Sequence, residues 1–260
     1  MIFGGKQPAF DQERPIVSHL LELRTRLLRL VVVLLITFLA IYPFSDYLYT
    51  WLSGPLRAVL PEGTSMIAIQ VASPFLIPMK LALLAAVLVC IPYILYQLWG
   101  FIAPGLYRHE KRLIWPLLIS STLLFYLGGA FAYFVVFPLV FAFFAAVTPT
   151  GVTMMTDIGE YLSFVIKLFF AFGVAFEVPV ATILLVRTGA TTRESLRAKR
   201  PYVIVGAFVM GMLLTPPDMV SQVLLAVPVW LLFELGIILS GWFVKATTAP
   251  ADEAEDNPST

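Results

Sequence analysis

Long apolar runs separated by short polar segments dominate the pattern along this chain. A membrane-spanning helix needs about 20 mostly apolar residues, because the hydrocarbon core is about 30 Å thick and a helix rises about 1.5 Å per residue. Six runs meet or approach that length, namely residues 27–42, 75–101, 113–138, 158–186, 202–215 and 219–243. The pattern therefore predicts an all-α polytopic membrane protein with six transmembrane helices.

Prolines and charged residues limit the fifth and sixth runs. Only the 17 residues from 201 to 217 are uncharged between Arg200 and Asp218, and three of them are prolines. Residues 202–215 would form a helix only about 21 Å long. The sixth run contains Pro228. We therefore predict that the fifth and sixth helices are short, with ordinary tilted helices of misjudged length as the alternative.

The region after the third run is also uncharged, from residue 113 to residue 156. Residues 139–147 are too few to form a further span, and they precede the turn-forming segment 148–151. We therefore expect residues 139–147 to form an outer apolar cap that packs against the spans.

Composition agrees with a membrane protein and excludes other classes. Apolar residues make up 60% of the 260 residues and charged residues only 13%, whereas soluble proteins carry about 25% charged residues. The mean hydropathy is +0.91. So little charge cannot cover a soluble globular surface, and the polar composition of disordered chains is missing. The single cysteine, Cys90, excludes an internal disulfide.

Lysine and arginine are distributed unevenly among the predicted loops. Of the 17 basic residues, 14 lie before or at the start of the first run, after the second or fourth run, or after the sixth, whereas the opposite loops hold only Arg57. The positive-inside rule places the basic side in the cytoplasm, so both termini are predicted to be cytoplasmic. The first run is not expected to be a cleavable signal peptide, because no small-residue cleavage site follows it.

These assignments divide the chain into three regions. Residues 1–17 form a cytoplasmic N-terminal segment, and residues 18–244 form the transmembrane domain. Residues 245–260 are polar, acidic and proline-containing, which predicts a disordered acidic cytoplasmic tail.

Motifs of the common enzyme classes are missing from the sequence. It contains no H-E-x-x-H, G-x-S-x-G or G-x-x-x-x-G-K-[ST] pattern. His19 and His109 lack clustered acids at ligand spacing, so we predict no metal site. Asp157 and Glu160 are interpreted as helix-start acids rather than a catalytic pair. An enzyme is therefore the weakest hypothesis.

Two acidic residues lie among the basic residues of the cytoplasmic side. Residues 18–27 place His19, Glu22 and Arg26 on one helix face, which predicts an amphipathic helix at the membrane surface. A structural i, i+4 pair between Glu22 and Arg26 is the alternative to a binding role. Glu110 lies in the basic loop after the second run, where it could simply neutralise its neighbours. Together, the two acids could receive a ligand with two guanidinium groups.

Further acids lie within or beside the last three runs. An acid near the middle of a span costs about 2.5–3.5 kcal/mol to insert, so we expect Glu177 to face other helices or a wet cavity. Lys167 is about 15 Å away along the helix and cannot be its partner. Glu234 could extend to the inner interface, and Asp218 could cap the sixth helix.

Five long segments, in order, identify a family. They are residues 18–27, 71–80 (VASPFLIPMK), 96–112 (YQLWGFIAPGLYRHEKR), 173–180 (GVAFEVPV) and 199–222 (KRPYVIVGAFVMGMLLTPPDMVSQ). With them the chain resembles the TatC family, the multispanning core of the twin-arginine protein translocase, from about residue 18 to residue 241. The family has six spans, cytoplasmic termini and short last two helices, which agrees with the pattern above.

The resemblance implies roles for particular residues. The signal-peptide-binding positions would be Glu22, Arg24, Arg26, Arg108 and Glu110, where the two acids bind two consecutive arginines. Glu177 would be the intramembrane glutamate of the concave face, and Pro55 and Asp218 would be functional positions of the outer loops. The last two helices, which carry Gln222 and Glu234, would contact the single-span partners.

The resemblance also implies a function. The chain would bind twin-arginine signal peptides at the cytoplasmic face and initiate proton-motive-force-driven transport of folded proteins across the bacterial inner membrane. The implied partners are TatB, TatA, the signal peptides and the lipid bilayer, in an oligomer of TatBC units, without nucleic acid or cofactor. One alternative is a solute transporter or channel that uses Glu177 as a proton or ion site. A membrane-embedded hydrolase is a third, although Cys90 lies in an apolar helix and is no promising nucleophile.

Overall fold

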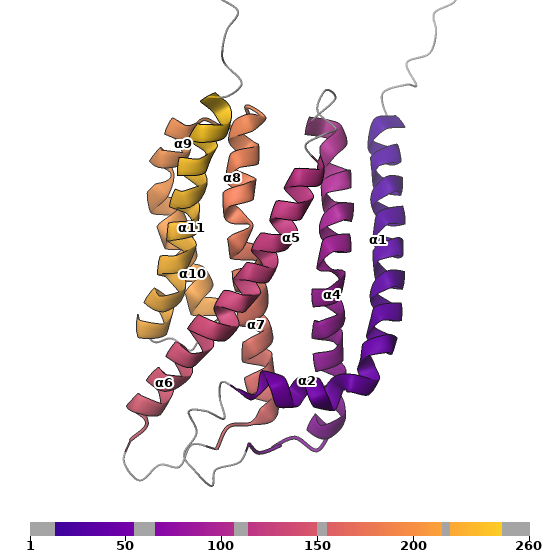
Figure 1. Cartoon of the computed structure of the whole chain (residues 1–260), viewed down its shortest axis with the longest axis vertical. Coiled ribbons are helices and arrows are strands. Elements are labelled where there is room, and N and C mark those ends of the chain that lie inside the picture. Colours follow the sequence, from indigo (N-terminus) through magenta and orange to yellow (C-terminus); the bar gives the residue numbers. More distant parts are fainter. Residues whose placement is uncertain (1–13, 55–65, 107–113, 150–154, 215–218, 246–260) are drawn as a thin grey trace, which may run out of the picture.

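The computed structural model describes residues 14–54, 66–106, 114–149, 155–214 and 219–245, and helices account for most of them (Figure 1). The elements are α1 (Arg14–Ile41), η1 (Tyr42–Phe44), α2 (Ser45–Leu52), α4 (Ser73–Leu106), α5 (Ile114–Phe131), η3 (Ala132–Val136), α6 (Phe137–Val147), α7 (Ile158–Phe176), α8 (Val178–Arg187), α9 (Arg193–Ala198), α10 (Arg200–Leu214) and α11 (Met219–Lys245). Within these ranges the only β-pairing is a single bridge, between Ile67 and Asp157. The predicted all-α fold is confirmed.

Five helical stretches are long and apolar enough to cross a membrane. They are Leu20–Leu52, Ser73–Phe101, Trp115–Val147, Ile158–Arg187 and Gln222–Gly241, and Arg200–Leu213 is a shorter apolar helix. These stretches correspond to the six predicted runs. The helix α1 begins, and α11 ends, at the same end of the bundle (Figure 1). We call this end the terminal face, and the end that carries α2 the opposite face.

The short-helix prediction is correct for the fifth run and wrong for the sixth. The helix α10 has 15 residues, or about 22 Å. The helix α11 has 27 residues and contains Pro228 in its interior. Transmembrane helices tolerate an internal proline because neighbouring groups satisfy the freed carbonyl, so this proline does not end the helix.

The third run continues beyond its predicted end at Pro138. Residues 139–147 were expected to form a separate cap, but α5, η3 and α6 follow one another without a break to Val147. The element η3 is a π-helical turn, and Pro138 stands in the first turn of α6 directly after it. A proline inside a continuous helix leaves a carbonyl of the preceding turn without its N–H partner, and a π-helical turn is one of the local adjustments that accommodate it in membrane helices. The result is one long, diagonal helix (Figure 1).

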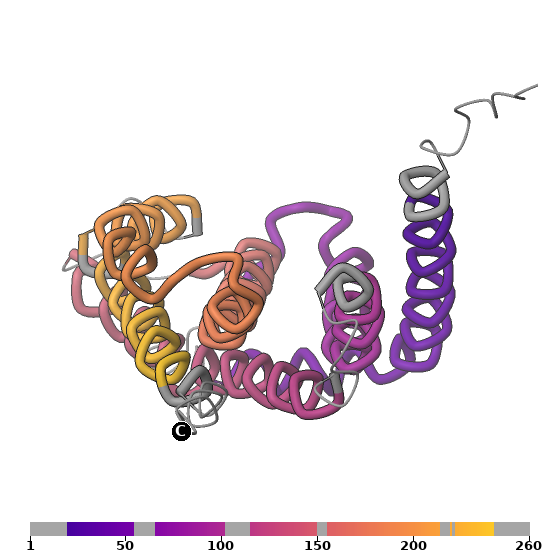
Figure 2. Tube along the Cα trace, turned by 90° about the horizontal axis from the view of Figure 1, so that it is seen from above, coloured from indigo at the N-terminus to yellow at the C-terminus, as the bar shows by residue number. Residues whose placement is uncertain are grey.

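The helices form a curved row when they are seen from the terminal face. The helices α1 and α4 lie at one end of the row, and α9, α10 and α11 lie at the other (Figure 2). A core of large apolar side chains from α4, α6 and α7 holds the centre together, with Phe137, Phe172 and Leu162 among its fully buried members. The apolar face of α1 is exposed, as at Leu27 and Leu35, which suits contact with lipid.

Two glycines allow α5 and α7 to cross closely. A Cβ atom on Gly128 of α5 would collide with the backbone carbonyl of Phe172 and lie 2.9 Å from its carbon. A Cβ atom on Gly173 of α7 would lie 2.6 Å from the Phe125 ring. Small residues are typical where transmembrane helices pack backbone to backbone. This crossing fixes the position of α7, and therefore of Glu177.

Two tyrosines attach α2 to the bundle at the opposite face. The Tyr133 hydroxyl donates a hydrogen bond to the Trp51 carbonyl at 3.0 Å, and the Tyr161 hydroxyl donates one to the Leu52 carbonyl at 2.7 Å. The last carbonyls of a helix have no partner within it, and these hydroxyls supply one. The Trp51 and Tyr133 rings are also stacked, with centroids 4.5 Å apart.

We expect Gly128→Ala to destabilise the protein. The added methyl group would meet backbone rather than a flexible side chain, so the helices must separate, at a cost of about 1–3 kcal/mol. Thermal unfolding in detergent should show a lower midpoint. The matched control is Gly206→Ala on α10, where a Cβ atom meets nothing within 4 Å. Equal midpoints for the two variants would contradict the close crossing.

Candidate functional site

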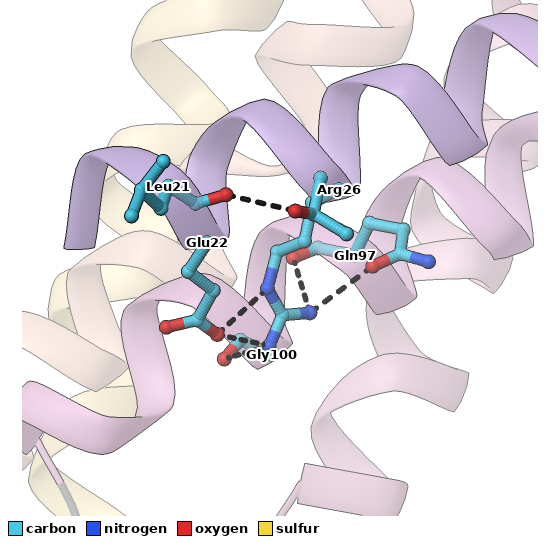
Figure 3. A network of polar contacts seen from close by, with 6 residues as sticks. Leu21, Glu22, Arg26, Gln97 and Gly100 are labelled. Carbon is cyan, nitrogen blue, oxygen red and sulfur yellow. Dashed lines mark hydrogen bonds and ion pairs between the residues drawn. The ribbon is translucent and has the colours of Figure 1, made fainter. Parts of the chain in front are cut away.

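The predicted pair between Glu22 and Arg26 forms on α1. The Arg26 Nε and Nη2 atoms donate hydrogen bonds to Oε1 of Glu22 at 2.9 and 2.6 Å (Figure 3). The spacing of four residues places the two side chains on one helix face. The amphipathic segment and the first span form one continuous helix, since α1 runs unbroken from Arg14 to Ile41.

Arg26 also binds α4. Its Nη1 atom donates to the Gln97 side-chain oxygen at 3.0 Å and lies 3.5 Å from the Gln97 carbonyl oxygen, and its Nη2 atom donates to the Gly100 carbonyl at 3.1 Å (Figure 3). Gln97 is buried and donates from Nε2 to the Tyr93 hydroxyl. A Cβ atom on Gly100 would lie 2.7 Å from Nη1 of Arg26, so the glycine leaves room for the guanidinium group.

Sequence reasoning missed Gln97 and Gly100. In the sequence they stand out only as a polar amide and a glycine inside an apolar run. Arg26 is 71 residues away from Gln97, so no local spacing connects them. The two residues turn a pair on one helix into a contact between two helices.

Glu22 and Arg26 differ in how many of their hydrogen-bonding atoms are still available to a ligand. All three nitrogens of the Arg26 guanidinium group donate to oxygens of the chain. Glu22 accepts through Oε1 alone among the described residues, and its side chain is 40% exposed, against 24% for Arg26. The Glu22 carboxylate can therefore receive a further donor, whereas Arg26 holds it in place. Arg24 is exposed on the same helix.

Four of the predicted site residues lie outside the described residues. They are Pro55, Arg108, Glu110 and Asp218. Glu110 lies in the sequence between α4 and α5, and its proposed partnership with Glu22 stays a prediction.

Glu177 lies at the break between α7 and α8. Pro179, in the first turn of α8, has no N–H group to continue the helical pattern across the break. The Ser121 hydroxyl of α5 lies beside the Glu177 carboxyl group and interacts with it electrostatically. In turn, Nε1 of Trp99 on α4 donates to Ser121 Oγ at 3.3 Å. The prediction that Glu177 faces other helices is confirmed.

One oxygen of this carboxyl group is buried and unsatisfied. Oε1 of Glu177 is buried and has no hydrogen-bond partner among the described residues. Ser121 is fully buried. Sequence analysis did not single out Ser121 or Trp99, because a few hydroxyl residues (120–122) and a single tryptophan in apolar runs carry no specific functional signal.

Glu234 has a partner within the chain. Its Oε1 and Oε2 atoms lie 2.6 Å from Nε and Nη2 of Arg200, at the start of α10. The extension of Glu234 to the inner interface stays a prediction. Gln222 also connects α11 to α10, because its Nε2 atom donates to the Phe208 carbonyl at 2.9 Å.

At the opposite face, Asp157 caps α7 as the sequence predicts for a helix-start acid. Its Oδ1 atom accepts from the backbone N–H groups of Gly159 and Glu160 at 2.9 and 3.0 Å. Its Oδ2 atom accepts from the N–H group of Ile69 at 2.9 Å, a contact that sequence analysis did not foresee. The hydrogen bonds from Ile69 and then Glu160 lower the pKa of this carboxyl group below its usual value.

Chemically, this arrangement suits recognition. The accessible carboxylate of Glu22 lies beside basic residues, where it can bind a cationic group by charge-assisted hydrogen bonds. Among the described residues no three histidine, cysteine or acidic side chains are grouped so that they could hold a metal ion. The fold and the site therefore define a multi-pass helical membrane protein with a carboxylate site at one face.

The family model for "Sec-independent protein translocase protein (TatC)" matches residues 18–228, and the chain therefore belongs to the TatC family. This match covers most of the transmembrane domain. Members of this family are components of a protein translocase rather than enzymes. The family and the apolar helices identify a multi-pass protein of the bacterial inner membrane.

Two curated relatives cover nearly the whole chain. The TatC protein of Azotobacter chroococcum is 60% identical over 253 residues, which is 97% of this chain and 98% of the relative. The TatC protein of Escherichia coli K12 is 55% identical over 234 residues, which is 90% of this chain and 91% of the relative.

A solved structure shares the fold. The crystal structure of a twin-arginine translocase receptor, TatC, superposes with a TM-score of 0.78 at 40% sequence identity. The match covers 87% of this chain and 99% of the solved one. The resemblance found in the sequence is confirmed, and it outweighs the solute-transporter and hydrolase alternatives.

We expect Arg26→Lys to loosen α1 from α4. Lysine keeps the charge but lacks the planar fork that reaches Glu22, Gln97 and Gly100 together. Each lost hydrogen bond to the charged group costs about 1.5–3 kcal/mol. Spin labels at Leu27 and Leu98, which are both exposed, should report a broader distance distribution. The control is Arg29→Lys, because Arg29 is exposed on α1; broadening there as well would contradict the role of Arg26.

The connection between Ile69 and α7 should depend on pH. Because the folded pKa of Asp157 is lowered from its ordinary value of 3.8, the ionised form stabilises the fold above that value. This stabilisation is lost as the pH falls through the lower folded pKa. Below pH 3.8, hydrogen exchange of the Ile69 amide should therefore be faster than the rate extrapolated from higher pH, where Asp157 is ionised. In Asp157→Asn this acid-induced acceleration should disappear, and its persistence would show that another group is responsible.

Proposed function

We propose that this protein is the signal-peptide receptor of a twin-arginine translocase. It binds the paired arginines of the signal peptide through Glu22 and Glu110. It then initiates proton-motive-force-driven transport of folded proteins together with TatA and TatB. The single observation that carries this proposal is the Glu22 carboxylate, held by Arg26 through one oxygen and accessible for a further donor.

The positions of basic residues support a cytoplasmic terminal face. The end of α8, the helix α9 and the start of α10 carry five basic residues, namely Arg187, Arg193, Arg197, Lys199 and Arg200. The positive-inside rule assigns such an end to the cytoplasm. Glu22 then faces the compartment in which signal peptides are made, and both termini lie in that compartment.

The proposed roles of the arginines near Glu22 differ. The Arg26 side chain is committed to Glu22, Gln97 and Gly100, so we assign it the task of orienting the acid. Arg24 is exposed and can contact the peptide backbone or exclude unpaired cations. Arg108 and Glu110, from the segment between α4 and α5, complete the proposed site.

Energetics set the expected mode of binding. An exposed ion pair contributes about 0.2–1 kcal/mol, and a hydrogen bond to a charged group contributes about 1.5–3 kcal/mol. Two arginines on two carboxylates therefore select the peptide but hold it weakly. The apolar stretch of the signal peptide must add packing against the helices, because transfer from lipid to a groove gains little hydrophobic free energy.

The α10–α11 end of the bundle is the proposed contact for the single-span partners. Met210, Leu213 and Val223 are exposed there, and an apolar partner helix can pack on them. Gln222 and Glu234 hold α10 and α11 together through Phe208 and Arg200. In this proposal they act by fixing the shape of the contact surface, and several TatBC units assemble through such contacts.

Photo-crosslinking in native membranes tests the receptor function. A labelled twin-arginine signal peptide should crosslink to the protein, and a twin-lysine peptide should do so at least tenfold less, because lysine lacks the bidentate geometry of arginine. Glu22→Ala and Glu110→Ala should each abolish the arginine-specific crosslink.

The control for this experiment is Glu160→Ala, which removes an exposed acid at the opposite face. This variant should crosslink like the wild type. Equal labelling by both peptides, or full labelling of the Glu22→Ala variant, would show that the paired arginines are not the recognised group.

A further inference from the structure

One turn of α4, residues 97–100, contacts two different acidic sites. Successive helix residues are rotated by about 100°, so residues 97 and 100 share one face and residue 99 points to nearly the opposite side. Gln97 and Gly100 hold Arg26, and through it Glu22 of α1. Trp99 donates a hydrogen bond to Ser121 of α5, and Ser121 interacts electrostatically with the neighbouring Glu177. The chain of contacts between the two acids passes through this turn.

We propose that the turn 97–100 of α4 couples the Glu22 site to Glu177, with Gln97, Trp99 and Ser121 as positioning residues. Binding of a guanidinium group to Glu22 would then change the environment of Glu177 inside the membrane. This inference rests on the proposed function, because the ligand at Glu22 is the arginine pair of a signal peptide. It adds a route by which occupancy at the terminal face reaches the intramembrane acid.

The contacts explain why the turn must respond to a ligand. Arg26 shares its guanidinium group between the Glu22 carboxylate and three oxygens of the turn, which are one amide and two carbonyl oxygens. A second guanidinium group on Glu22 competes with Arg26 for negative charge. Arg26 then binds the α4 oxygens more strongly and pulls on the turn.

The other side of the turn is sensitive to small movements. The Trp99–Ser121 distance of 3.3 Å is already longer than the usual 2.7–3.2 Å of such bonds. A shift of a few tenths of an ångström therefore makes or breaks it. Ser121 is fully buried, so it cannot move to follow the indole without moving α5.

Coupling between two sites is reciprocal, which gives a direct test. If ligand binding at Glu22 alters the contact between Trp99 and Ser121, then breaking that contact must alter ligand binding at Glu22. Ser121 cannot touch a peptide, because it is fully buried. An effect of Ser121 on affinity must therefore pass through the protein.

The experiment measures the Kd of a fluorescent twin-arginine signal peptide for the full-length protein in detergent. We expect Trp99→Phe and Ser121→Ala to raise Kd about threefold to tenfold, in the usual range of such couplings. Ser121→Thr keeps the hydroxyl group and should restore the wild-type value. The matched controls are Ser120→Ala and Trp115→Phe. The Ser120 hydroxyl donates to a carbonyl of its own helix, and Trp115 is an exposed tryptophan at the start of α5. Both should leave Kd unchanged.

A double-mutant cycle then identifies the path. In an Arg26→Lys background the connection from Glu22 to α4 is weakened, and Trp99→Phe should change Kd less than twofold. If Arg26→Lys abolishes binding, Gln97→Leu provides the background. Fold-changes that simply multiply in the double variant would overturn the proposed path through the turn.

A spectroscopic measurement on the wild-type protein tests the coupling even if the Trp99 and Ser121 variants fold poorly. In wild-type protein labelled with 5-fluorotryptophan, the peptide should shift the ¹⁹F resonance of Trp99, and Glu22→Gln should remove that shift. The resonance of Trp230 on α11 should not move. If the wild type does not bind the peptide, the proposed function itself is wrong. If it binds but Trp99 does not respond and Ser121→Ala leaves Kd unchanged, the coupling is wrong and the receptor function stands.

Discussion

The hydrocarbon of a bilayer offers no hydrogen bonds, so each polar group in this protein must find its partner within the chain or its ligands. That constraint explains where the helices meet. Arg26 joins α1 to α4, Trp99 of α4 donates to Ser121 of α5, and Arg200 joins α10 to Glu234 of α11. The polar side chains that a soluble protein would leave in water here act as the specific contacts between helices.

The same constraint separates the residues that hold the site from those that can bind. Arg26 has satisfied all its nitrogens, whereas Glu22 and Glu177 each have a carboxylate oxygen without a partner among the described residues. In a medium that does not supply water, an unsatisfied acid is expensive. Glu177 carries this cost inside the membrane, whereas Glu22 at the terminal face is 40% exposed and open to a further donor.

Sequence patterns predicted the contacts that are local and missed those between distant segments. The period of the helix was sufficient to predict the pair Glu22–Arg26 and the cap at Asp157. It could not predict Gln97 or Ser121, because their partners are fixed by tertiary packing. Proline misled the length estimates, since Pro138 and Pro228 are both accommodated within long helices. The family resemblance supplied the functional roles of Pro55 and Asp218, which no local pattern identifies.

The attachment of α2 has a consequence for how the protein is made. Its two hydroxyl donors, Tyr133 and Tyr161, lie 82 and 109 residues further along the chain than the carbonyls they bind. During synthesis α2 therefore emerges long before its partners exist, and it must wait until the third and fourth spans are inserted. The hydrogen bonds from Tyr133 and Tyr161 to α2 can form only once the first four spans have packed together. The attachment of α2 at the opposite face is therefore a late step of folding.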